Sequence, residues 1–307
     1  MQLERLFVEL SDQTRPIRSA GLAAMSDLAG DELEIFKSCW PKVPPERRAD
    51  VVHKLLDLAE DNPELTFDTV FFLCLKDEQD RVREKAIAGL WECEERSLAT
   101  TLIRMLQCDA APNVRAAAAQ ALGRFVDLAQ EGKTSSREQE RLRDALLTAA
   151  KDDGQPQEVR RRALESCAAI NALEVTVLIR GSYASGDTAV RASAIFAMGR
   201  NGDPAWLPVI VKELGSSAPE MRFEAAAACG QLGEPHLVPK LLPLLRDTDA
   251  QVRLATVEAL GSIGGPLARK VLQTELKSDD EPIRDAAEQA LQHIQLLEDP
   301  LLFRSLP

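Results

Sequence analysis

Apolar residues recur along this chain at the spacing of one face of an α-helix, and the whole pattern returns at regular intervals. In DAQVRLATVEALGSIG, residues 249–264, the apolar side chains form one stripe of an amphipathic helix. DEPIRDAAEQALQHIQ, residues 280–295, repeats the pattern with most other letters changed. The pattern predicts a row of similar helices.

Nine copies of this helix can be aligned on a Val-Arg pair or a close variant of it. The last five arginines are evenly spaced, and we call their common separation the repeat period; the earlier spacings are irregular. One helical hairpin cannot bury its apolar stripe alone, but stacked hairpins share a continuous core. The pairs are Ile17-Arg18, Arg47-Arg48, Val82-Arg83, Val114-Arg115, Val159-Arg160, Val190-Arg191, Met221-Arg222, Val252-Arg253 and Ile283-Arg284.

A second, proline-containing helix is predicted between successive Val-Arg helices. Pro204, Pro235 and Pro266 are each separated by one repeat period, and each suits a first helical turn, where the missing N–H costs nothing. Pro208 and Pro239 recur with the same separation further in, so we expect them to bend this helix. Small residues such as those at 225–226 on the Val-Arg helices permit close approach of neighbouring helices.

The pattern of a proline-containing helix followed by D-x-x-V-R-x-x-A-A-x-A-L-G resembles the HEAT family, in particular the HEAT-like repeats of the phycobilin lyase type. The resemblance covers about residues 10–295 and is carried by DAQVRLATVEALG, DTAVRASAIFAMG, APEMRFEAAAACG and APNVRAAAAQALG. It implies an all-α fold, a right-handed α-solenoid of about nine hairpins forming a single domain over residues 1–307. The expected units are 1–30, 31–64, 65–97, 98–134, 135–171, 172–202, 203–233, 234–264 and 265–307.

The column of arginines has a structural interpretation in this family. The resemblance implies that the arginines form a ladder with acidic residues in the turns of adjacent units. Three aspartates each precede an arginine by four positions, where they can also cap the incoming helix. The expected ladder comprises Arg191, Arg222, Arg253 and Arg284 with Asp187, Asp249 and Asp280.

The third, fourth and seventh residues of each Val-Arg helix should point away from the core. The resemblance implies that these helices line a concave face. Most residues at these positions are small or polar, but Phe196, Phe223 and Leu254 are large and apolar in three consecutive units. They could hold an amphipathic partner segment, with Glu224 and Glu258 as an acidic rim. Alternatively, they lean sideways and belong to the core.

The fifth unit departs from the repeat period, because Arg115 and Arg160 are more than one period apart. We expect a longer loop from Gln130 to Ser136, followed by a helix that Ser135 and Glu138 begin with a capping box. This unit is also locally basic, and Arg161 and Arg162 form either a solvated face or a docking patch for an acidic partner.

The charge of the chain disfavours some classes of binding partner. The net charge is −12 and the pI near 4.9, which disfavours nucleic acid and anionic membrane surfaces. The sequence has no uncharged apolar run long enough to span a membrane, and its beginning does not fit a signal peptide. We therefore expect a cytoplasmic protein without membrane insertion.

The chemistry-bearing residues do not form a recognisable catalytic, metal or cofactor site. The six cysteines lack CxxC spacing, and Cys167 and Cys229 fall at core positions of the repeat. His53, His236 and His293 lack the paired His-Glu motifs of a di-iron hydroxylase. Four large aromatic residues are expected to serve mainly in packing. They are Trp40, Trp91, Trp206 and Tyr183.

The preferred hypothesis is a non-enzymatic scaffold or adaptor that binds a partner protein or peptide on the concave face. The alternative is a bilin or chromophore lyase-like subunit, or another accessory protein of a HEAT-based enzyme. No cofactor is expected, and the sequence does not identify the partner.

Overall fold

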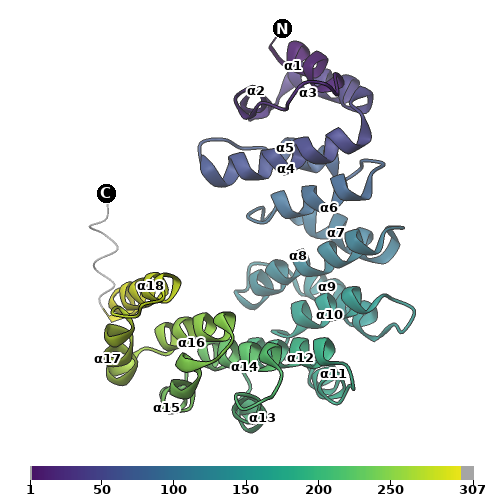
Figure 1. Ribbon diagram of the computed structural model, residues 1–307. Helices are drawn as coiled ribbons and strands as arrows, with labels where there is room; N and C mark the ends of the chain where they lie inside the picture. The colour runs from purple at the N-terminus through teal and green to yellow at the C-terminus, as the bar shows by residue number, and fades with distance from the viewer. Residues whose placement is uncertain (1, 299–307) are drawn as a thin grey trace. The chain divides into compact units, whose positions relative to one another are not determined.

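The computed structural model describes residues 2–298, and these residues form helices, turns and loops without a β-strand (Figure 1). The chain divides into two compact parts, Met1–Ala163 and Leu164–Pro307. Each part is a stack of helices, so the predicted all-α solenoid is confirmed. Helix α10 (Gln157–Cys167) spans the division.

In the N-terminal part, the Val-Arg helices α4, α6 and α8 pack on one another in order, and α5 and α7 pack beside them. The first predicted Val-Arg helix corresponds to α2, which is only one turn long and begins after Ile17 and Arg18. The helices are α1 (Gln2–Ser11), α2 (Ser19–Leu22), α3 (Gly30–Cys39), α4 (Pro45–Asp61), α5 (Asp68–Cys74), α6 (Asp80–Gly89), α7 (Arg96–Cys108), α8 (Pro112–Gln130) and α9 (Ser136–Lys151), with 3-10 turns at Ala23–Met25 and Trp40–Lys42.

In the C-terminal part, the Val-Arg helices α12, α14, α16 and α18 lie side by side, and α11, α13, α15 and α17 each pack against the Val-Arg helix that follows (Figure 1). This is the hairpin stack that the repeat period predicts. The helices are α11 (Leu173–Tyr183), α12 (Thr188–Asn201), α13 (Leu207–Glu213), α14 (Pro219–Leu232), α15 (Val238–Leu241), α16 (Ala250–Ile263), α17 (Gly265–Glu275) and α18 (Glu281–Glu298).

Neighbouring Val-Arg helices of the C-terminal part approach each other at glycines. A Cβ added at Gly199 on α12 would lie 2.7 Å from the Cα of Ala228 on α14, well inside normal contact distance. Only glycine therefore lets the helices approach this closely, and the predicted close packing of small residues is confirmed. The contact recurs along the array, with Gly230 against Ala259 and Gly261 against Ala290.

The prolines of the second helix lie in first turns of short helical elements. Pro204 opens a 3-10 turn, Pro204–Trp206, and α13 begins only afterwards, so Pro208 is its second residue. Pro235 and Pro239 are arranged in the same way, with a 3-10 turn Pro235–Leu237 before α15. Pro208 and Pro239 thus lie where the 3-10 turn changes to an α-helix, in a first turn where the missing N–H costs nothing.

The additional residues of the fifth unit lengthen helices more than the loop. Helix α8 has 19 residues and α9 has 16, whereas α12, α14 and α16 each have 14. Gln130 is the last residue of α8 and Ser136 the first of α9, so the expected loop is shorter at both ends. The predicted capping box is present, with the Ser135 and Glu138 side chains each bonded to the other's backbone N–H.

Candidate functional site

The repeat arginines bind carboxylates and carbonyls within the stack. Arg222 binds both carboxylate oxygens of Asp247, with Nε–Oδ2 at 2.6 Å and Nη2–Oδ1 at 2.7 Å. Its Nη1 donates to the carbonyl oxygens of Ser216 and Ser217 in its own turn. The guanidinium hydrogen bonds hold the pKa of Asp247 below its usual value despite partial burial. One arginine therefore ties two successive turns together.

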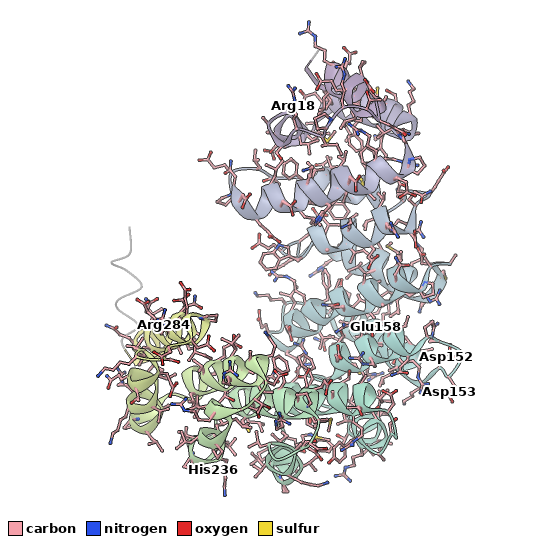
Figure 2. All side chains as sticks on the ribbon, in the orientation of Figure 1. Arg18, Asp152, Asp153, Glu158, His236 and Arg284 are labelled. Carbon is pink, nitrogen blue, oxygen red and sulfur yellow. The ribbon has the colours of Figure 1, made fainter. Side chains whose placement is uncertain are left out.

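Related contacts occur at other repeats. Arg253 donates to Asp280 at 2.8 Å, Arg191 to Glu213 at 3.4 Å, and Arg284 to the Ser278 carbonyl at 2.8 Å. In the N-terminal part, Arg83 binds both oxygens of Asp109, and Arg48 forms a fully buried pair with Asp77 at 2.6 Å. Arg18 and Arg284 are labelled in Figure 2, one on each part.

The acidic residues expected in the ladder divide their roles. Asp249 accepts from the backbone N–H groups of Gln251 and Val252 as the N-cap of α16, and Asp187 accepts from Val190 as the N-cap of α12. The carboxylate that binds Arg222 is Asp247, two positions before Asp249. Asp280 holds the register position of Asp249 but binds Arg253 of the previous repeat at 2.8 Å, so this predicted ladder pair is present.

The apolar residues expected on the exposed face lie on three adjacent helices. Phe196 on α12, Phe223 on α14 and Leu254 on α16 are each partly exposed. Glu258 is exposed and Glu224 is half-buried. The three large side chains are therefore neither enclosed in the core nor fully in solvent.

The expectation that the third and fourth positions point away from the core was wrong for several small residues. Ala192, Ser193 and Ala255 are buried, because small side chains let the neighbouring helix pack over them. The Ser193 hydroxyl donates to Glu165 Oε1 from this buried position. Small residues at these positions are not always buried, since Ser19 and Ala20 of the first, shortened Val-Arg helix are exposed.

The basic pair of the fifth unit is bound by its own helix. Glu158 Oε2 accepts from Arg161 Nη1 at 3.0 Å, and its Oε1 accepts from Arg162 Nε at 2.8 Å. Figure 2 labels Glu158 together with Asp152 and Asp153, which precede α10, and Asp153 pairs with Arg160 at 2.9 Å. The basic run is thus interleaved with carboxylates.

Three stretches of the chain match a family model described as HEAT repeats, at residues 69–168, 175–249 and 210–292, and together they cover more than half of the sequence. The chain belongs to the HEAT repeat family. No curated protein sequence matches it significantly.

Several solved structures are similar to this HEAT protein at low sequence identity. A structure of the complex of CpcE and CpcF of phycocyanin lyase from Nostoc sp. PCC7120 is 17% identical, with 92% of this chain and 97% of that chain covered and a TM-score of 0.53. YibA from Escherichia coli is 21% identical, with 80% and 90% covered and a TM-score of 0.46. Human deoxyhypusine hydroxylase is 19% identical, with 96% of each chain covered and a TM-score of 0.31. At these identities the likeness concerns the fold alone.

The cysteines and histidines of this HEAT protein lie apart from one another. Cys167 and Cys229 are buried, as the repeat register predicts, and burial raises the pKa of the Cys229 thiol to about 12. Within residues 2–298, no cluster of three or more His, Cys, Asp or Glu side chains is arranged to hold a metal ion. No helix in the same range is long and apolar enough to span a membrane.

Two aromatic residues differ from the expected packing role. The Tyr183 side chain is half-buried, and its hydroxyl donates to Glu213 Oε1. Trp91 is 64% exposed, so its assignment to packing was wrong. Trp91 lies beyond the end of α6, which is Gly89.

Trp91 lies at the mouth of a cavity of about 510 Å³ between α6, α7 and α8, which sequence reasoning missed. A signal for it was available, since Trp91 occupies the repeat position that is glycine at 199, 230 and 261. A smaller cavity of about 120 Å³ is lined by the start of α9 and by Lys133 and Thr134 of the preceding loop. Phe125 of α8 lines both cavities.

Proposed function

We propose that this HEAT repeat protein is a non-enzymatic scaffold or adaptor that binds a partner protein or peptide across the surface of its Val-Arg helices. The proposal rests on one observation, the partial exposure of Phe196, Phe223 and Leu254 on three adjacent helices. Large apolar side chains in a row are the anchors that a partner helix or peptide needs. We call these three residues the apolar row.

The negative charge around the apolar row favours a partner segment with one apolar side and one basic side. Glu258 is exposed beside Leu254 in the repeat register, and the whole chain carries a net charge of −12. Complementary charge steers association and excludes acidic competitors. Arg161 and Arg162 are left out of the proposed surface, because Glu158 already binds both guanidinium groups.

A chromophore lyase-like subunit is the alternative function, and it draws support only from likeness of fold to the CpcE and CpcF complex. The two proposals differ in a simple observable. A bilin-binding protein would retain visible absorbance after incubation with free bilin and removal of the unbound pigment. The scaffold proposal expects no such absorbance and assigns no catalytic residue.

The scaffold proposal can be tested with selected peptides and two matched triple variants. Peptides long enough to form several helical turns would be selected from a display library against the wild-type chain and measured by fluorescence anisotropy. The test variant is Phe196→Ala, Phe223→Ala and Leu254→Ala. The control is Leu173→Ala, Val177→Ala and Leu267→Ala, which truncates exposed apolar residues of α11 and α17.

If the apolar row anchors the partner, the test variant should weaken binding by about 30-fold or more, as for truncated hot spots, while the control binds like wild type. If instead the test variant loses several kcal/mol of unfolding free energy and binds unchanged, its side chains belong to the core. That result would refute the proposed surface.

A further inference from the structure

The cavity beside Trp91 has the size and lining of a binding site. Its volume of about 510 Å³ falls within the usual range of about 300–1,000 Å³ for ligand pockets. The cavity would hold several large side chains, because one of about 150 Å³ already accepts a benzene ring. The apolar lining comprises Ile87 and Leu90 from α6 and its end, Leu98 and Leu102 from α7, and Phe125 from α8.

The cavity exists because α6 ends early. Helix α6 has 10 residues and ends at Gly89, whereas α12, α14 and α16 each have 14 residues. In those longer helices, a glycine in the last turn packs against an alanine of the next Val-Arg helix, as Gly199 does against Ala228. The equivalent positions are Trp91, just beyond the end of α6, and Ala121 of α8, and both line the cavity instead. One helix–helix contact of the repeat is replaced by open space.

The edge beside the cavity is acidic. Glu92, Glu94 and Glu95 follow Trp91 closely, and all three are exposed. Arg124 of the cavity wall pairs with Glu94 at 2.8 Å. Within the described part of the chain, Glu92 and Glu95 have no ion pair.

The field of these carboxylates acts on neighbouring groups. The pKa of Asp68, at the start of α5, is raised by burial and further by the charges of Glu95 and Glu92. An approaching cation would relieve this repulsion. The exposed face of the Trp91 indole also attracts a Lys or Arg side chain.

We propose that this Trp91 cavity docks a cationic, amphipathic segment of a partner protein. Apolar side chains one helical turn apart fill the space under Trp91, and the adjacent Lys or Arg side chains bind Glu92 and Glu95. An acidic segment is excluded by the same carboxylates. The site lies wholly within residues 84–125 and does not depend on the apolar row of the C-terminal part.

Three designed helical peptides of equal length, labelled with fluorescein, provide the probes. The first has Leu at i, i+3, i+4 and i+7 with Lys elsewhere, the second has Glu in place of Lys, and the third has Ser in place of Leu. Anisotropy titrations with the full chain should show binding of the first peptide alone, weakened by added salt. Equal binding of the Lys and Glu peptides would overturn the proposal.

Two variants test the cavity itself. Trp91→Ala removes a mostly exposed side chain, so the urea midpoint should stay near that of wild type while affinity falls about tenfold or more. Ala121→Leu narrows the cavity, and it should weaken binding without lowering the urea midpoint. If Ala121→Leu binds like wild type or unfolds more readily, the space is not an open site.

Further variants test whether the acidic residues beside Trp91 contribute to binding and whether binding occurs at this site. Glu92→Lys with Glu95→Lys should weaken binding of the Lys peptide, whereas Glu174→Lys with Glu288→Lys changes the net charge equally at exposed C-terminal positions and should not. The triple variant of the apolar row should retain binding, so failure of that site is separable from failure here. If sedimentation shows wild-type dimers that Trp91→Ala abolishes, a second copy occupies the cavity and the proposal is wrong.

Discussion

Gly199→Ala is expected to destabilise the C-terminal part even though alanine is the better helix former. The new Cβ would lie 2.7 Å from the Cα and 2.8 Å from the Cβ of Ala228. Carbon atoms in contact are about 3.5–4.0 Å apart, so α14 must retreat from α12 by about 1 Å. Such overpacking costs about 1–3 kcal/mol. The gain in helix propensity returns at most about 1 kcal/mol.

We therefore expect Gly199→Ala to lower the free energy of unfolding by about 1–2 kcal/mol, measured by urea denaturation followed by circular dichroism. Gly181→Ala is the matched control. Gly181 lies in α11 with no atom within 4 Å of the added Cβ, and its φ is not in the positive range. The control should raise the unfolding free energy by about 0.5–1 kcal/mol. A Gly199→Ala protein as stable as this control would refute the close helix contact.

Four further results are expected. Asp247→Asn should cost about 3 kcal/mol of unfolding free energy, because it leaves Arg222 without its bidentate partner in a mostly buried site. Urea denaturation of this variant, of Arg222→Met and of the double variant measures the coupling energy between the two side chains. On acidification, the free energy of unfolding should fall from about pH 5 downward. The reason is that the pKa values of Asp247 and Asp109 are lowered in the folded state. Arg222 lowers the pKa of Asp247, and although burial raises that of Asp109, hydrogen bonds from Arg83 and the Ala111 N–H lower it overall. The unfolded state, with pKa values of about 3.9, then takes up protons first, and Asp247→Asn should flatten this loss in urea titrations at successive pH values. Ser135→Ala should destabilise the start of α9 by about 1 kcal/mol, seen as faster amide exchange there but not in α16. A thiol reagent at neutral pH should label exposed Cys108 and spare buried Cys74 and Cys229 until urea unfolds the chain.

The repeating architecture could be predicted from the sequence because its determinants are local and periodic. The helix caps at Asp187 and Asp249, the turn glycines and the close-packed alanines each depend on a few neighbouring residues. The same register located the arginines. These features follow from the repeat period alone.

The candidate sites depend on where the period fails, which local patterns do not show. A Cβ at Gly89 would lie 2.5 Å from the ring of Phe71, so the end of α6 is adapted to a residue of another helix. The early end of α6 opens the cavity. The sequence shows that Trp91 replaces the repeat glycine, but not that the helix ends at Gly89. Similarly, the partner of the arginine changes between repeats: Arg222 binds Asp247, whereas Arg253 binds Asp280, because the position equivalent to Asp247 is Ser278.

The equal spacing of glycine and alanine contacts in the C-terminal part makes the array's length adjustable. If unequal recombination removed one full period, the segment 219–249, Gly199 would meet Ala259 in place of Ala228, and the glycine–alanine contact would be kept. Duplication of a period would preserve the interface in the same way. A gene encoding such an array can thus gain or lose whole segments, each with its own outward-facing residues such as Phe223, without redesigning the junctions.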